Sequence, residues 1–266
     1  MTSGTADGLH YEVHAGPAGA ETVLLSAGLG GSATFWTPQM AALTERFRVL
    51  LYDHRGTGRS DRSLKPDHSV VVMAEDIVTV LDATDTGRAH VVGHAAGGLA
   101  GLQLALDRPE RLDRLVVVNG WSRPDPHIAR CFAARTRLLE AVGPAAYVEA
   151  QALFLYPPDW SSRNDARLQA EAPHHIAGFP ATDVMLTRIA ALLAFDIDAD
   201  LPEIAAPVLV SASADDLLVP PLCARRLVER LPNATLDLVP WGGHAFTQTA
   251  SDAFNAKLVA WLSGET

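Results

Sequence analysis

Three short stretches of this 266-residue sequence carry residue types that could do nucleophilic or acid–base chemistry. "VGHAAGG" at residues 92–98 follows an apolar run, "DDLLVP" at 215–220 follows another, and "WGGH" ends at His244. A histidine oriented by a carboxylate can act as a general base, and an acid and a histidine at the ends of successive strands can meet. Asp216 is the better candidate for the acid, and Asp215 is the alternative.

Residues 92–98 have the outline of a nucleophile elbow, in which a strand, a Gly-x-x-x-Gly turn and a helix lift the central side chain above a sheet. Ala95 stands at the nucleophile position, where a serine would be required for covalent catalysis. His94 beside it should point aside in this geometry. The alternative is that Gly93, Gly97 and Gly98 only let a helix pack close to its strand.

A glycine-rich loop, "SAGLGGS" at residues 26–32, could supply backbone N–H groups to a substrate oxygen. The N–H groups of Leu29 and Ala96 would then form an oxyanion hole. The loop lacks the Gly-Lys-Ser/Thr of a phosphate-binding P-loop, so nucleotide binding is not expected. "YDHRGTGRS" at 52–60 reads as a hydrogen-bonded turn in which Asp53 and Arg55 pair structurally.

The apolar runs suggest an α/β fold with a mostly parallel sheet covered by helices on both faces. They lie at 23–25, 49–51, 90–92, 115–118 and 208–210, and helical patterns at 71–83 and 97–107 alternate with them. Residues 8–14 alternate like an antiparallel edge strand, with His10 and His14 on one face. A strand at the edge of a sheet favours solvated histidines over a metal site.

The alternation stops at Trp121 and resumes near Val208. We therefore predict a core of residues 1–120 and 201–266, and a helical lid at 121–200 with helices near 127–142, 144–154 and 184–194. Pro157-Pro158 and Pro173 should interrupt the lid helices, and His174-His175 should lie in a turn. Trp121 and Trp160 should pack the lid onto the core.

Composition excludes several classes of function. The net charge is −10 with no basic run, which argues against a nucleic-acid partner. The first thirty residues do not resemble a signal peptide and no apolar run reaches membrane-spanning length, so we expect a cytoplasmic protein with no membrane partner. Cys131 and Cys223 are expected as reduced packing thiols. We expect a small-molecule substrate, no cofactor and no metal, and the sequence leaves open whether two copies form a homodimer.

The order of elbow, acid and histidine resembles that of the α/β-hydrolase family, and nearly the whole chain resembles the Rut-pathway D proteins of its pyrimidine-utilisation branch. The stretches that carry this resemblance are "GLGGS" (28–32), "YDHRGTG" (52–58), "VNGW" (118–121), "EAQALFLYPPDW" (149–160), "DDLLVP" (215–220) and "GGHA" (242–245). Alanine at the elbow fits this branch.

The resemblance implies hydrolysis of carbamate or 3-aminoacrylate in uracil breakdown. Without a serine, His244 oriented by Asp216 would activate a water molecule, and Leu29 and Ala96 would stabilise the developing charge. A cationic lid residue should hold the substrate carboxylate. The candidates are Arg123, Arg130, Arg135 and Arg188, with no basis in the sequence for choosing among them.

Three other functions stay open. The protein could be a ligand binder without catalysis, although a retained His244 and Asp216 argue against this. It could be a serine hydrolase whose nucleophile was replaced by Ala95. It could also be a cofactor-independent oxygenase or lyase in which the His–Asp pair deprotonates the substrate.

Overall fold

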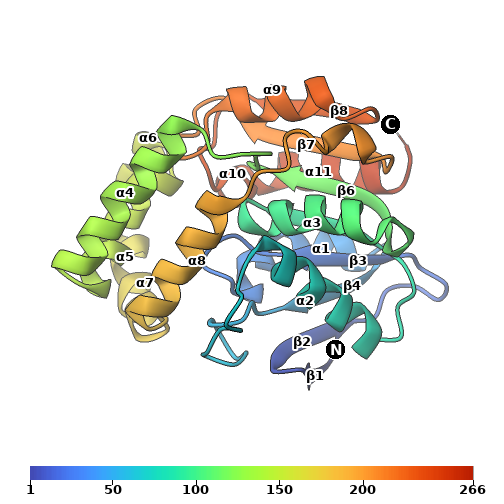
Figure 1. The fold of residues 1–266 in the computed structure, drawn as a ribbon, viewed down its shortest axis with the longest axis horizontal. Helices are drawn as coiled ribbons and strands as arrows, with labels where there is room; N and C mark the ends of the chain where they lie inside the picture. Colours follow the sequence, from blue (N-terminus) through green and yellow to red (C-terminus); the bar gives the residue numbers. More distant parts are fainter. Residues whose placement is uncertain (266) are drawn as a thin grey trace.

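A single mostly parallel sheet forms the centre of the computed structural model, which describes residues 1–265 (Figure 1). Its strands run in the order β1-β2-β4-β3-β5-β6-β7-β8. The neighbours β1–β2 and β2–β4 are antiparallel, and all other neighbours are parallel. The strands are β1 (Thr2–Ala6), β2 (Leu9–His14), β3 (Thr22–Ser26), β4 (Arg48–Tyr52), β5 (Ala89–His94), β6 (Leu112–Val118), β7 (Val208–Ser213) and β8 (Ala234–Val239). The expected parallel core strands are confirmed.

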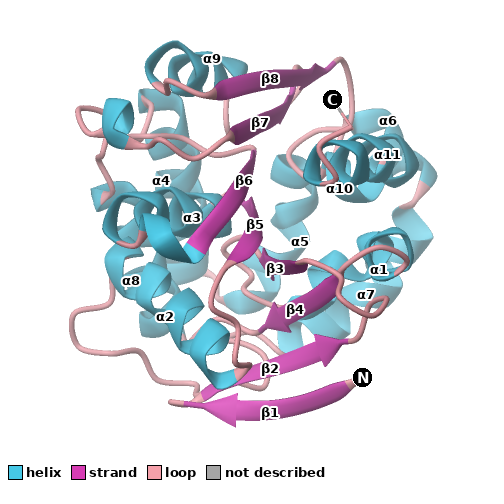
Figure 2. Ribbon diagram, turned by 90° about the vertical axis from the view of Figure 1, so that its right-hand side faces the viewer, coloured by secondary structure: helices cyan, strands magenta, loops and turns pink. Residues whose placement is uncertain are grey.

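Helices cover both faces of this sheet, as Figure 2 shows. One face is covered by α2 (Val70–Ala83), α3 (Ala96–Asp107) and α9 (Pro221–Arg230), and the other by α1 (Thr37–Thr44) and α11 (Ser251–Leu262), with short α10 (Phe246–Thr249) beside them. Each face has its own apolar core. Strand β5 is buried along its whole length, which explains why its sequence shows a continuous apolar run.

Five helices lie between β6 and β7 in the chain and beyond one end of the strands in space, at the left of Figure 1. They are α4 (Pro126–Ala141), α5 (Pro144–Leu155), α6 (Pro158–Arg163), α7 (Asp165–Ala177) and α8 (Thr182–Ala194). We call α4 to α8 the helical segment. Single-turn 3-10 helices occur at Ala33–Trp36, Pro109–Arg111 and Leu201–Glu203. Within residues 1–265 no single helix has the length and apolar character of a membrane span. Only α7 and α8 taken together have that length and composition, and they are bent by 103° to each other.

Two local expectations were wrong. The strand at 9–14 is not the edge, because β1 pairs with it from Thr2 to Ala6 and covers its outer side. Pro173 does not break a helix; it lies inside α7, and His174 and His175 occupy the last turn of that helix instead of a loop. Pro157 and Pro158 do separate helices, since α6 begins at Pro158 with its proline ring in the first turn.

Candidate active site

The turn between β5 and α3 is the elbow that the sequence predicts. Ala95 has φ 44° and ψ −109°, a conformation that is strained for any residue with a side chain, and its N–H donates to the carbonyl of Val118 at 2.8 Å. Gly93 and Gly97 make the sharp turn sterically feasible: a Cβ on Gly93 would lie 2.3 Å from the Gly97 backbone, and one on Gly97 2.2 Å from the Ser26 carbonyl oxygen. The elbow therefore presents a methyl group where a hydrolase of this type carries its nucleophile.

His244 and Asp216 meet through a hydrogen bond of 2.8 Å between Nδ1 and Oδ2. Asp216 lies in the loop after β7 and His244 in the loop after β8, so the two parallel strands deliver both side chains to the same edge of the sheet. The other oxygen of Asp216, Oδ1, accepts from the N–H groups of Leu218 (2.7 Å) and Val219 (2.9 Å). Three donors fix this carboxylate, and Nε2 of His244 is the ring nitrogen left to act on water.

Asp215, the alternative acid, does not contact His244 through its side chain. It accepts from the hydroxyl of Ser213 at 2.5 Å and from the N–H of Gly243 at 2.9 Å. These bonds hold the loop that carries His244 in place. Asp215 is therefore a structural support, and Asp216 is the partner of the histidine.

The backbone carbonyl of His244 is held by two side chains that the sequence analysis did not single out for this purpose. It accepts from Nε2 of His94 at 2.9 Å and from Nδ2 of Asn119 at 2.7 Å. Asn119 also accepts from the N–H of Ser213 at 3.2 Å, and so joins the loops after β6, β7 and β8. The sequence signal for Asn119 was a polar residue directly after a buried strand, within "VNGW".

His94 points aside from the elbow and beneath His244, with ring centroids 4.7 Å apart. Because Nε2 donates to a carbonyl, Nδ1 carries only a lone pair, and it faces Gly28, where a Cβ would lie 2.7 Å away. A side chain at position 28 would clash with His94, which explains why the first residue of the "GLGGS" loop is a glycine. Burial lowers the pKa of His94 to about 3, helped by the charge of the neighbouring His244, so its ring is neutral at pH 7.

Leu29 lies in the loop after β3, and Ala96 directly follows Ala95 in the elbow. The N–H of Ala96 is the first of α3, one of the four that a helix leaves without an acceptor inside the helix. The loop at Leu29 is fixed from the helical segment, because Nη2 of Arg188 donates to the Leu29 carbonyl at 3.0 Å. These positions suit the two donors of an oxyanion hole, and the assignment stays a prediction.

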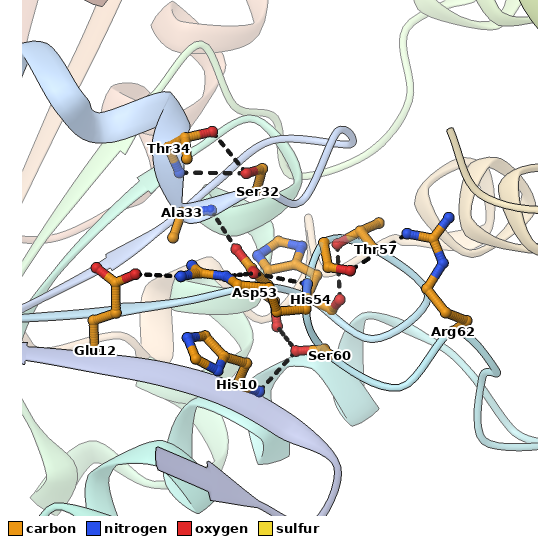
Figure 3. A network of polar contacts seen from close by, with 12 residues as sticks. His10, Glu12, Ser32, Ala33, Thr34, Asp53, His54, Thr57, Ser60 and Arg62 are labelled. Carbon is orange, nitrogen blue, oxygen red and sulfur yellow. Dashed lines mark hydrogen bonds and ion pairs between the residues drawn. The ribbon is translucent and has the colours of Figure 1, made fainter. Parts of the chain in front are cut away.

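The turn after β4 is a structural network, but its pairs differ from the expected one. Asp53 accepts from the N–H of Ala33 at 2.7 Å (Figure 3). It also accepts from Arg59, whose Nε lies 2.8 Å from Oδ2. Arg55 pairs instead with Asp76 at 2.8 Å. Burial alone would raise the pKa of Asp53, but these bonds hold it below its ordinary value. Asp53 and Arg55 therefore do not pair with each other: Arg59 occupies Asp53, and Asp76 and Asp7 occupy Arg55.

His54 connects this turn to the glycine-rich loop. Its Nδ1 lies 3.2 Å from Nη2 of Arg188, which can only donate, so Nδ1 is the acceptor and Nε2 donates to the Ser26 hydroxyl at 3.1 Å. Burial holds the pKa of His54 well below its usual range, and the positive charge of Arg188 adds to this effect. The buried His54 is thus a neutral connector beneath the Leu29 loop.

The remaining sequence candidates separate by burial. Arg123 and Arg130 are exposed, whereas Arg135 and Arg188 are buried within the structure. Trp121 is buried, and Trp160 stacks on Tyr156 with ring centroids 4.4 Å apart. Over residues 1–265, no three His, Cys, Asp or Glu side chains are grouped so that they could hold a metal ion.

The arrangement can do one kind of chemistry with the groups it has. His244 oriented by Asp216 can take a proton from water, and backbone N–H groups beside the elbow can stabilise an oxyanion. Ala95 offers no nucleophile, so no acyl-enzyme can form at the elbow.

Comparison with known proteins agrees with this geometry. Residues 21–247 match the model of the α/β-hydrolase fold family. A Caulobacter sp. protein named "Putative carbamate hydrolase RutD" is 68% identical over 100% of this chain and 99% of its own length. A Variovorax paradoxus protein of the same name is 55% identical over 96% of both chains.

Among solved structures, the enol-lactonase of Burkholderia xenovorans superimposes with a TM-score of 0.88 at 26% identity, covering 98% of this chain and 100% of that one. The fold of this chain is thus the α/β-hydrolase fold. The chain belongs to the α/β-hydrolase family and, within it, to the group of relatives named RutD.

Proposed function

We propose that this chain hydrolyses the C–N bond of a small, labile anion, with carbamate as the first candidate, and that it does so without a covalent intermediate. The observation that carries the proposal is the 2.8 Å bond between His244 and Asp216 beside an elbow that has alanine in place of a nucleophile. A base and its orienting acid have no use in a simple binding protein. The name of the relatives at 55% and 68% identity supports carbamate as the substrate.

In the proposed reaction, His244 takes a proton from a water molecule that occupies the space a serine hydroxyl would fill. The resulting hydroxide attacks the carbamate carbon, and the N–H groups of Leu29 and Ala96 stabilise the oxyanion. The protonated His244 then gives its proton to the amine nitrogen as the C–N bond breaks. Carbamate and water give bicarbonate and ammonia, with Asp216 remaining ionised throughout.

The second candidate substrate is 3-aminoacrylate, because the same base and donors would serve its imine tautomer. Water would add to the imine carbon and ammonia would leave, giving malonic semialdehyde. Both compounds decompose unaided in water, so they need modest help. An oxyanion hole and an intact pocket without a nucleophile still give roughly 10³- to 10⁴-fold acceleration. We place this activity in the cytoplasm, in uracil breakdown, as the Rut-pathway resemblance implies.

The test is the decay of freshly prepared carbamate and, in parallel, of freshly generated 3-aminoacrylate, with and without the purified protein. Ammonia release is followed against serum albumin at equal concentration, and every assay is repeated under nitrogen. We expect oxygen-independent acceleration of at least one compound. Acceleration that requires oxygen would point to an oxygenase. Failure to accelerate either compound would overturn the proposal and favour a ligand-binding role.

A further inference from the structure

Two buried arginines of the helical segment differ sharply in their hydrogen bonding. Arg188, on α8, is 2% exposed and donates to the carbonyls of Arg55 at 2.7 Å and Leu29 at 3.0 Å. Burial lowers its pKa to about 10, which leaves it cationic at neutral pH. Its role is to join α8 to the two loops beside the elbow. Both terminal nitrogens of Arg188 are therefore engaged within the protein, and only its Nε is buried without a partner among residues 1–265.

Arg135, on α4, is 4% exposed, and its Nε is buried without a hydrogen-bond partner. No hydrogen bond or ion pair joins its terminal nitrogens to another residue from 1 to 265. Its charge lies instead over three aromatic rings, 4.8 Å from the centroid of Tyr147 and 5.5 Å from those of Phe132 and Phe154. Cation–π contacts offset part of the lost hydration, but they satisfy none of the five N–H donors. A buried cation without an anion is costly, and buried charges in proteins are as a rule paired.

A second unsatisfied polar group belongs to one of the rings that Arg135 contacts. The hydroxyl of Tyr147, on α5, is buried and has no hydrogen-bond partner within the described chain, and the residue is 2% exposed. Burial raises the pKa of Tyr147, and the positive charges of Arg135 and Arg188 oppose that rise. The guanidinium of Arg135 can only donate and the Tyr147 hydroxyl can donate as well, so the pair suits a ligand rich in acceptors.

Helix α4, which carries Arg135, contacts the loop that carries Asp216. Cys131, one turn before Arg135 on the same face of α4, contacts the carbonyl of Leu217 at 3.7 Å, and Leu217 follows Asp216 directly. Helix α4 also packs against α8, whose Arg188 holds the Leu29 loop. Arg135 therefore lies on a helix that contacts both the Asp216 loop and the helix that fixes the Leu29 loop.

We propose that Arg135 and the Tyr147 hydroxyl form the receptor for the planar CO₂⁻ group of the substrate. The inference rests on the proposed function for the reaction, but the anion site is defined by its own unpaired donors. Guanidinium nitrogens bind such a group in a bidentate fashion, and the phenol adds a third donor. Carbamate and 3-aminoacrylate share this group, so the receptor selects small carboxylate-like anions over neutral amides and esters.

The test uses the full-length protein and acetate as the probe, in the variants Arg135→Met and Tyr147→Phe. Arg130→Met is the matched control, because Arg130 lies on the same helix but is exposed. Acetate binding is measured by calorimetry and by the shift in Tm, against sodium chloride at equal ionic strength. KM and kcat are then measured separately for carbamate and 3-aminoacrylate, which shows which of the two anions the receptor serves.

We expect acetate to stabilise the wild type and Arg130→Met, and Arg135→Met to bind it about 10- to 100-fold more weakly, with KM raised by a similar factor. Tyr147→Phe should weaken binding about threefold to tenfold. Arg135→Met should be at least as stable as the wild type without ligand, since methionine removes an unpaired buried charge. A purely structural Arg135 would give the opposite result, with lower stability and unchanged acetate affinity, and would overturn the proposal.

The two proposals can fail separately. If acetate binding depends on Arg135 but neither compound is hydrolysed, the anion receptor stands and the proposed reaction does not. If hydrolysis occurs while acetate binding and KM are unaffected in Arg135→Met, the reaction stands and the receptor assignment is wrong.

Discussion

At the residue scale, the chemistry depends on a single methyl group. Ala95 occupies the strained conformation that a nucleophile elbow imposes, with φ 44°, although it carries no reactive atom. The residues near it are held in fixed positions: His244 bonds to Asp216, and the carbonyl of His244 accepts from His94 and Asn119. This combination favours water as the nucleophile in the space beside Ala95.

Substitution of Ala95 tests that interpretation. Ala95→Ser would place a hydroxyl where the water is expected, so carbamate hydrolysis should fall by about tenfold or more, and p-nitrophenyl acetate should release a burst of nitrophenolate. Ala95→Gly is the control, because glycine keeps the space open and tolerates the positive φ. Faster carbamate hydrolysis in Ala95→Ser than in the wild type would instead indicate a serine hydrolase that lacks its nucleophile.

His94 predicts a specific dependence of stability on pH. Its folded pKa of about 3 lies below the ordinary value of 6.5, so between these pH values the unfolded chain binds a proton that the folded chain does not. The contribution of His94 to the free energy of unfolding is therefore complete above pH 6.5. It is lost as the pH falls below this value, by up to about 1.4 kcal/mol per pH unit. Urea titrations from pH 7 to 4 should show this loss in the wild type relative to His94→Gln. Parallel curves for the two proteins would contradict the assignment of a neutral, buried His94.

At the element scale, the contact between α8 and the core fixes the position of the Leu29 loop. Arg188 spans from α8 to the carbonyls of Arg55 and Leu29 and to the ring of His54. One planar guanidinium thus links the helical segment to the loops after β3 and β4. The position of the Leu29 N–H therefore depends on a helix far away in the sequence.

Replacing this arginine by lysine should affect stability and turnover together. A single ammonium group cannot reach three acceptors in different directions, so we expect Arg188→Lys to lower the free energy of unfolding by about 1–3 kcal/mol. It should also reduce kcat, because the Leu29 donor is displaced. Arg130→Lys, on the exposed side of α4, should leave both unchanged. Urea unfolding and steady-state kinetics measure the two effects, and an Arg188→Lys protein equal to the wild type in both would refute the link.

The elements near the site could be predicted because their sequence signals are local. Gly93 and Gly97 fix the elbow through close backbone contacts, and the buried run of β5 leads directly into it. The contacts made by Arg135 and Arg188 could not be predicted, because the four candidate arginines look alike in the sequence until the helices pack. Likewise, Pro173 fits inside α7 because its neighbours continue the helix, which a rule for single prolines does not detect.

At the scale of the whole molecule, parallel strands bring together residues that are far apart in the chain. Strands β5, β6, β7 and β8 are neighbours in that order, so Ala95, Asn119, Asp216 and His244 reach one edge of the sheet from loops separated by up to 150 residues. The order of the motifs predicted this meeting, since it is the order of the α/β-hydrolase family. It did not predict β1, whose short, mostly polar sequence has no apolar pattern and which is held by its pairing with β2.

The most direct test of the account is the rate of carbamate decay with the wild type and with His244→Gln, at equal protein concentration and after circular dichroism has shown that both are folded. Glutamine keeps much of the volume of histidine but cannot act as a base. The account predicts acceleration by the wild type and a loss of about 10²- to 10⁴-fold of it in His244→Gln. Equal acceleration by both proteins would contradict the claim that His244 activates the attacking water.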